Sequence, residues 1–233
     1  MTEKSIFRRQ TFENNKAKSV LIFACPFGTK IGLYRKLIKG LVKDGYSVVA
    51  YDFDNQVLLS GEPSYLLNLI NEANDDINRI IHNYEVQGIA NFGFYGTSLG
   101  AFVLFNAAAV IPELRWGIFN AGGNIARGVW ELKSTRRAFV RQGYTLDDLD
   151  KAWSKIIYPD FKHRDKRSRF IIMGSKNDHV APYSRLADFA GYITNKSGAE
   201  VDLKKVIGYG HNHSAFIGLT KCRRLIKQLD LKS

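Results

Sequence analysis

The stretch from Val86 to Pro112 contains no charged residue, although charged residues make up 24% of the chain. A stretch of this kind is either buried inside a folded protein or inserted in a membrane. Glycine and polar side chains recur through it, so it has no run of about 18 apolar residues, which a membrane helix would need. We therefore expect no membrane span here and interpret the stretch as a buried strand, a tight turn and a buried helix.

Apolar runs of strand length alternate with segments of helical periodicity along the rest of the chain. The expected strands are residues 19–25, 46–53, 88–95, 115–120, 169–174 and 201–207, with residues 6–12 as a candidate edge strand. Such alternation predicts an α/β fold, a mostly parallel sheet flanked by helices on both faces. With 233 residues, of which 45% are apolar, the chain is expected to form a single domain.

Residues 124–168 interrupt this alternation, because they separate two expected strands by far more than one helix requires. A helix is expected over Val129–Gln142, and Thr145 is expected to cap another helix that carries acidic residues in its first turn. We interpret residues 124–168 as a small helical cap inserted into a core formed by residues 1–123 and 169–233. Twelve basic residues against six acidic ones make residues 124–169 strongly basic.

The uncharged stretch contains Gly96-Thr97-Ser98-Leu99-Gly100, a G-x-S-x-G pattern between a strand and a helix. This is the context of a nucleophile elbow, a turn that strains the serine backbone and projects its hydroxyl above the sheet edge. Strand and helix approach so closely there that side chains at Gly96 and Gly100 would clash. The helix N-terminus beneath Ser98 also favours negative charge that develops in a reaction.

Two further motifs make the chain resemble an α/β-hydrolase, in particular the small-cap serine esterases, the monoacylglycerol-type lipases and the acyl thioesterases. In that superfamily an acid and then a histidine follow the nucleophile. Here Asp178 follows the strand at 169–174, in a turn whose Asp, Val and Pro recur in the family order, and His211 follows the strand at 201–207. Both lie at carboxyl ends of strands, on the edge expected for Ser98. The resemblance therefore implies a Ser98–Asp178–His211 catalytic triad.

Among the other histidines, one is an alternative to His211 as the catalytic base. His213 lies two residues after His211, and we prefer His211 because the family histidine usually follows a glycine directly after the strand. His179 adjoins the expected acid and is given at most a minor contact with substrate, while His82 and His163 are expected at the surface. No carboxylate or cysteine set completes a metal site around the two neighbouring histidines, so no metal and no cofactor is expected.

The resemblance also implies an oxyanion hole made of two backbone N–H groups. Leu99, the residue after the nucleophile, is expected to supply one. The other is expected from the loop at residues 25–29, where many family members carry His-Gly and this chain has Cys-Pro. Because Pro26 has no N–H group, Phe27 is the expected donor, with Gly28 next.

The activity implied is hydrolysis of a carboxylic ester or thioester through an acyl-enzyme on Ser98. The same triad serves acyltransferases and peptidases, which stay open within enzymes. The alternative from another class is a non-catalytic α/β-hydrolase-fold protein that binds an anionic ligand or nucleic acid. Aromatic side chains of the expected cap are candidates for an acyl channel, although aromatics at helical spacing more often serve packing. They are Trp130, Phe139, Tyr144, Trp153, Tyr158 and Phe161.

The formal net charge of +12 can steer anions toward the protein. No basic arm, RNP aromatic motif or zinc-finger spacing accompanies it, so no specific nucleic-acid partner is predicted. The expected partner is a small-molecule acyl ester or thioester, with an anionic part as an option. Two cysteines without a C-x-x-C pair form no disulfide framework, and the first residues lack a secretory apolar core, so a cytoplasmic location is expected.

Overall fold

The computed structural model describes residues 6–122, 125–161 and 168–230. Within these ranges seven strands form one sheet in the order β1-β3-β2-β4-β5-β6-β7. β1 pairs antiparallel with β3, and the other neighbouring strands pair in parallel. The strands are β1 (Phe7–Phe12), β2 (Ser19–Ala24), β3 (Tyr46–Phe53), β4 (Asn91–Thr97), β5 (Trp116–Asn120), β6 (Arg169–Gly174) and β7 (Glu200–Lys205).

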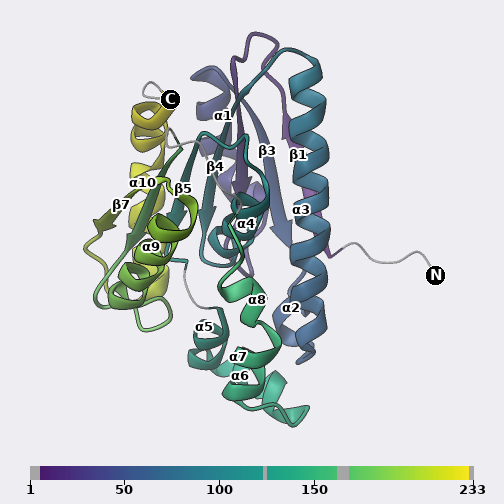
Figure 1. Ribbon diagram of the computed structural model, residues 1–233, viewed down its shortest axis with the longest axis vertical. Coiled ribbons are helices and arrows are strands. Elements are labelled where there is room, and N and C mark those ends of the chain that lie inside the picture. Colours follow the sequence, from purple (N-terminus) through teal and green to yellow (C-terminus); the bar gives the residue numbers. More distant parts are fainter. Residues whose placement is uncertain (1–5, 123–124, 162–167, 231–233) are drawn as a thin grey trace, which may run out of the picture.

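Helices cover both faces of this sheet (Figure 1). They are the 3-10 helix η1 (Ile31–Tyr34) and the α-helices α1 (Arg35–Lys43), α2 (Gln56–Leu59), α3 (Pro63–Val86), α4 (Leu99–Val110), α5 (Ile125–Glu131), α6 (Lys133–Arg141), α7 (Leu146–Ala152), α8 (Ser154–Ile157), α9 (Tyr183–Ser197) and α10 (His211–Asp230). Buried side chains of α3, α4 and α9 form one hydrophobic core with one sheet face, and those of α1 and α10 form a second core with the other face. The predicted mostly parallel sheet flanked by helices is therefore confirmed.

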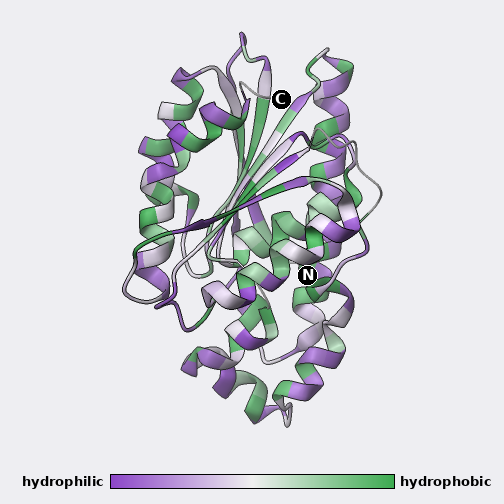
Figure 2. Cartoon of the chain, turned by 60° about the vertical axis from the view of Figure 1, so that its left-hand side comes forward, coloured by the Kyte–Doolittle hydropathy of each residue, from purple (hydrophilic) through white to green (hydrophobic). Residues whose placement is uncertain are grey.

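Burial explains why the central strands read as nearly continuous apolar runs. Along β2, Val20 and Ile22 point into one core, while Leu21 and Phe23 point into the other. A parallel strand covered on both faces has no solvent side, so it needs no alternation of polar residues. Figure 2 shows hydrophobic residues along the middle of the sheet and hydrophilic ones on the outer sides of the helices. α4 is buried on nearly all sides, which accounts for the uncharged stretch.

The helix expected over residues 129–142 is wrong, because two helices meet within that range. α5 ends at Glu131 and α6 begins at Lys133, with Leu132 between them in an extended conformation (φ −82°, ψ 114°). The buried hydroxyl of Thr135 lies within hydrogen-bond distance of the carbonyl oxygens of Val129 and Leu132. A side-chain donor thus replaces backbone donors at the junction and stabilises the break.

The four helices α5 to α8, here called the cap helices, lie beyond the carboxyl ends of the central strands (Figure 1). The indole N–H of Trp153 donates to the Pro63 carbonyl at 3.0 Å, and the amide of Asn106 on α4 donates to the Ile156 carbonyl at 3.0 Å. These bonds fix the cap helices to α3 and α4. The predicted N-cap at Thr145 is confirmed, since its hydroxyl accepts from the backbone N–H of Asp148.

The limits of the expected cap stay a prediction, because residue 124 lies outside the described ranges. His163 and the basic residues at 162, 164, 166 and 167 also lie outside them. Among the helices that are described, none combines the length and the hydropathy of a membrane-spanning segment.

Candidate active site

Ser98 lies at the tight turn between β4 and α4, with a φ of +52° and a ψ of −121°. Side chains other than glycine rarely adopt a positive φ, and holding one there costs on the order of 1–3 kcal/mol. A Cβ added to Gly96 would lie 2.5 Å from the Gly100 carbonyl oxygen, and one added to Gly100 would collide with the Ala24 carbonyl. The predicted close approach at both glycines is confirmed. The turn therefore holds the serine hydroxyl at the carboxyl edge of the sheet.

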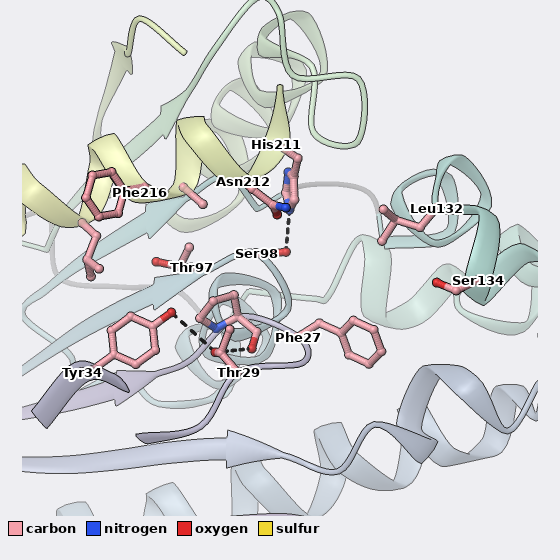
Figure 3. Close-up of a pocket in the computed structure, with 13 residues that line it drawn as sticks. Phe27, Thr29, Tyr34, Thr97, Ser98, Leu132, Ser134, His211, Asn212 and Phe216 are labelled. Atoms are coloured by element: carbon pink, nitrogen blue, oxygen red, sulfur yellow. Dashed lines mark hydrogen bonds between the residues drawn. The ribbon is translucent and has the colours of Figure 1, made fainter. Parts of the chain in front are cut away.

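Three side chains from distant parts of the chain meet at this turn. The Ser98 Oγ lies 2.8 Å from Nε2 of His211 (Figure 3). On the other side of the ring, His211 Nδ1 lies 2.9 Å from Oδ2 and 3.1 Å from Oδ1 of Asp178. An ionised carboxylate only accepts hydrogen bonds, so it favours the tautomer with the proton on Nδ1. Nε2 is then free to accept the proton of the Ser98 hydroxyl.

The carboxylate of Asp178 is buried and held on both sides. Besides His211, its Oδ1 accepts the backbone N–H groups of Val180 at 3.0 Å and Ala181 at 2.9 Å. Burial by itself would raise the pKa of Asp178, but the hydrogen bond and charge of His211 and the two backbone donors outweigh it and lower the pKa. Asp178 is therefore anionic at neutral pH and orients the imidazole ring.

The structure separates the two neighbouring histidines. α10 begins at His211, three residues earlier than expected, directly after Gly210 with its φ of +89°. His213 Nδ1 instead accepts the backbone N–H of Tyr209 at 3.1 Å, and the two rings stack with 5.6 Å between their centroids. His179 is exposed and does not line the cavity at Ser98. Among the described histidines, only His211 is thus hydrogen-bonded to the serine.

The two expected oxyanion donors come from the start of α4 and from the loop after β2. Leu99 is the first residue of α4, so its N–H has no acceptor within the helix. Phe27 lines the same cavity as Ser98, in the loop that follows β2. Figure 3 shows Phe27 across the cavity from His211. The role of both N–H groups as oxyanion donors stays a prediction.

A buried carboxylate anchors the far end of the Phe27 loop. Asp52, at the end of β3, accepts the backbone N–H of Ile31 at 3.0 Å and the ammonium of Lys30 at 3.2 Å. The guanidinium of Arg8 on β1 binds the same carboxylate at 2.6 Å. Burial raises the pKa of the Cys25 thiol at the near end of the loop, so Cys25 is a neutral core residue there.

A cavity of about 390 Å³ opens at Ser98. Its lining carries no permanently charged side chain: Pro26, Phe27, Thr29, Tyr34, Thr97, Ser98, Leu132, Ser134, His211, Asn212, Ala215, Phe216 and Leu219. Sequence reasoning missed most of these residues. The one usable signal was helical spacing, which puts Ala215 and Leu219 on the same side of α10 as His211.

None of the six aromatic residues considered for an acyl channel lines the described cavity at Ser98, so the structure bears out the favoured interpretation, which was packing. Phe139 and Trp153 are buried in the core and pack edge to face with centroids 5.5 Å apart. Phe161 packs against Phe105 of α4 in the same core. These rings attach the cap helices to the sheet layer. Within the described residues, no group of three or more His, Cys, Asp or Glu side chains is arranged to hold a metal ion.

No protein-family model and no curated protein matches the sequence. Solved structures nevertheless match the fold over most of the chain. An esterase of Pyrococcus furiosus, Pf2001, has a TM-score of 0.62 at 14% identity, covering 93% of this chain and 82% of its own. Brefeldin A esterase, a bacterial homologue of human hormone-sensitive lipase, has a TM-score of 0.66 at 13% identity, with 99% and 78% covered.

A peptidase shares the same fold with a smaller part of its chain. The acylaminoacyl peptidase of Pyrococcus horikoshii has a TM-score of 0.61 at 14% identity, covering 97% of this chain and 42% of its own. At such identities the likeness speaks for architecture and not for substrate. Sheet order, elbow and structural neighbours agree that this chain has the α/β-hydrolase fold.

Proposed function

We propose that this protein is a serine hydrolase that cleaves a carboxylic ester or thioester through an acyl-enzyme on Ser98. The observation that carries the proposal is the chain of hydrogen bonds from Asp178 through His211 to Ser98. Ser98, at the end of this chain, lines an open cavity. Packing does not explain a serine at this position, because glycine would fit there without backbone strain. A strained serine that contacts an imidazole is explained by the chemistry of its hydroxyl. This argues against the non-catalytic alternative.

In the proposed reaction, His211 Nε2 takes the hydroxyl proton as Ser98 Oγ attacks the acyl carbonyl carbon. Asp178 keeps the other ring nitrogen protonated and stabilises the imidazolium that forms. The N–H groups of Leu99 and Phe27 stabilise the oxyanion, and one such donor is worth about 3–4 kcal/mol. His211 then protonates the leaving alcohol or thiol, and a water molecule releases the acyl group by the reverse sequence.

Ester or thioester cleavage is proposed over peptide cleavage for two reasons. The uncharged and largely apolar lining of the cavity suits an acyl chain. The similar solved structures that are covered over most of their own length are named as esterases, whereas the peptidase is covered over 42% of its length. An acyltransferase would form the same acyl-enzyme and pass the acyl group to an acceptor other than water. This activity remains compatible with the proposal.

The test compares Ser98→Ala with the wild type on p-nitrophenyl esters of increasing chain length and on the matching acyl thioesters. Loss of Ser98 is expected to lower kcat by more than about a thousandfold. A fluorophosphonate probe should label the wild type at Ser98 and leave the variant unlabelled. An S98A protein that hydrolyses these esters at the wild-type rate would refute the proposal.

The base is tested with a matched pair of histidines two positions apart. His211→Ala is expected to lose kcat by several orders of magnitude, while His213→Ala, whose ring binds Tyr209, should stay within about threefold of the wild type. The reverse pattern would assign the base to His213.

A further inference from the structure

A second cavity adjoins the one at Ser98. It measures about 360 Å³ and lies between α2 and α6. The lining residues are Leu59, Ser60, Ser134, Arg137, Ala138, Arg141 and Gln142. Ser134 lines both cavities, so both lie beside the start of α6. Figure 3 shows Ser134 at the side of the first cavity opposite Phe216, so the second cavity extends the site away from α10.

The two cavities differ in charge. The first has no permanently charged lining, whereas Arg137 and Arg141 line the second without any carboxylate. The two arginines are four residues apart on α6, so they lie on the same side of that helix. Neither guanidinium has a hydrogen bond or an ion pair with any other part of the protein that the structure describes. Their donors are therefore available to a ligand.

The helix that carries these arginines, α6, packs tightly against the turn that follows α2. Gly61, with a φ of +78°, packs against the carbonyl of Ala138 so closely that a Cβ would collide with it. The Ser60 hydroxyl accepts the backbone N–H of Glu62 at 3.1 Å, which keeps the turn before α3 in place. The second cavity is therefore bounded by fixed backbone on both sides, and the arginines project from one of them.

We propose that Arg137 and Arg141 form an anion subsite of the substrate site, which binds a phosphate group of the acyl ester or thioester whose carbonyl lies at Ser98. The inference rests on the proposed function. The guanidinium fork matches the geometry of phosphate oxygens and binds two of them in a bidentate manner. A substrate with an apolar acyl part and an anionic part would thus occupy the two cavities together.

The simpler explanation is a solvated basic helix face, and α6 itself offers the control. Arg136 is exposed, adjoins Arg137 in sequence and lines neither cavity. Arg136→Gln removes the same charge as Arg137→Gln or Arg141→Gln from the same helix. A general effect of positive charge would appear equally in all three variants, whereas a subsite effect would appear in the latter two alone.

The experiment uses two pairs of compounds that differ in their phosphates. One pair is 1-octanoylglycerol 3-phosphate and 1-octanoylglycerol, and the other is octanoyl-4′-phosphopantetheine and octanoylpantetheine. We expect the phosphorylated member to be preferred in at least one pair. R137Q and R141Q should each raise its KM by about three- to tenfold, while R136Q and the neutral substrates change less than about twofold.

The pair that shows the preference identifies the source of the phosphate as a glycerol ester or a coenzyme. Equal turnover of both members in both pairs, or an equal loss in R136Q, would overturn the subsite. Binding of the four compounds to S98A, measured by calorimetry, separates this proposal from the previous one. Phosphate-dependent binding that needs Arg137 and Arg141, with neither turnover nor fluorophosphonate labelling of the wild type, would keep the subsite and refute the hydrolase.

Discussion

Ser98 is one of two described residues other than glycine with a positive φ, and its strain has a measurable cost. Ser98→Gly should relieve it, because glycine adopts a positive φ without penalty. Ser98→Ala keeps a Cβ and therefore keeps the strain. Glycine also increases the conformational entropy of the unfolded chain, which lowers the stability of S98G and offsets part of the relief. We therefore expect the free energy of unfolding of S98G to exceed that of S98A by about 1 kcal/mol.

Urea denaturation of the two inactive variants measures this difference directly. Equal free energies of unfolding would mean that the turn holds its conformation without strain. Both variants lack the hydroxyl, so the loss of the hydrogen bond to His211 cancels in the comparison.

The lowered pKa of Asp178 leads us to expect that the stability of the protein depends on pH in the acidic range. Its pKa is lowered in the folded protein, mainly by His211 and two backbone donors that outweigh burial, while the unfolded value is about 3.9. A lowered folded pKa stabilises the protein above the unfolded value, and this contribution is lost as the pH falls through the folded pKa. Between pH 5 and 3 the free energy of unfolding should therefore fall more steeply in the wild type than in Asp178→Asn.

Denaturation curves at pH 7, 5, 4 and 3 check this expectation. The amide that replaces the carboxyl group in D178N cannot ionise, so this variant is the control for every other titrating group. Parallel pH profiles for the two proteins would show that Asp178 is not held as an anion.

The three residues of the proposed triad could be located from the sequence, but the walls of the cavity could not. Ser98 directly follows β4, and Asp178 and His211 lie in the segments that follow β6 and β7. The carboxyl ends of parallel strands share one edge, so strand order brings all three residues to one side. Tyr34 and Phe216 line the cavity because of how η1 and α10 pack above the sheet. No local pattern encodes such an approach between elements.

At the scale of single elements, the capping box at the start of α7 is the clearest local determinant. The Thr145 hydroxyl accepts the N–H of Asp148 at 3.2 Å, and the Asp148 carboxylate accepts the N–H of Thr145 at 2.8 Å. Thr145→Ala should cost about 1 kcal/mol, the usual value for removing such a cap. Thr220→Ala is the matched control, since Thr220 is exposed in the interior of α10 and caps nothing.

Thermal or urea denaturation followed by far-UV circular dichroism measures both variants. An unchanged midpoint in T145A would mean that α7 unfolds before the rest of the protein and does not contribute to its global stability.

Burial decided which elements were predictable. The strands at residues 46–53 and 169–174 were predicted to the residue, because most of their residues are apolar, β-branched or aromatic and nearly all of them are buried. The break at Leu132 was not, since it depends on the buried Thr135 hydroxyl. The antiparallel pairing of β1 also escaped the sequence, because an edge strand pairs in either direction and the partner β3 is distant in the chain.

At the scale of the whole molecule, the positive charge of the protein lies outside the lining of the cavity at Ser98. The net charge is +12, yet the cavity at Ser98 is lined without a permanent charge. A field of this kind attracts anions over distances near the Debye length, about 10 Å at 0.1 M salt, and contributes little to the bond-breaking step. We therefore expect electrostatics to act on encounter and on the anion subsite, and the triad to act on every ester alike.

Salt dependence distinguishes these two contributions. For 1-octanoylglycerol 3-phosphate, kcat/KM should fall several-fold between about 0.05 and 0.5 M NaCl, because screening shortens the reach of the positive field. For 1-octanoylglycerol it should change by less than about twofold. R137Q removes one of 34 basic residues, so it should keep most of the salt slope while raising KM for the phosphorylated ester. Equal slopes for the two esters would show that the basic surface does not guide the substrate to Ser98.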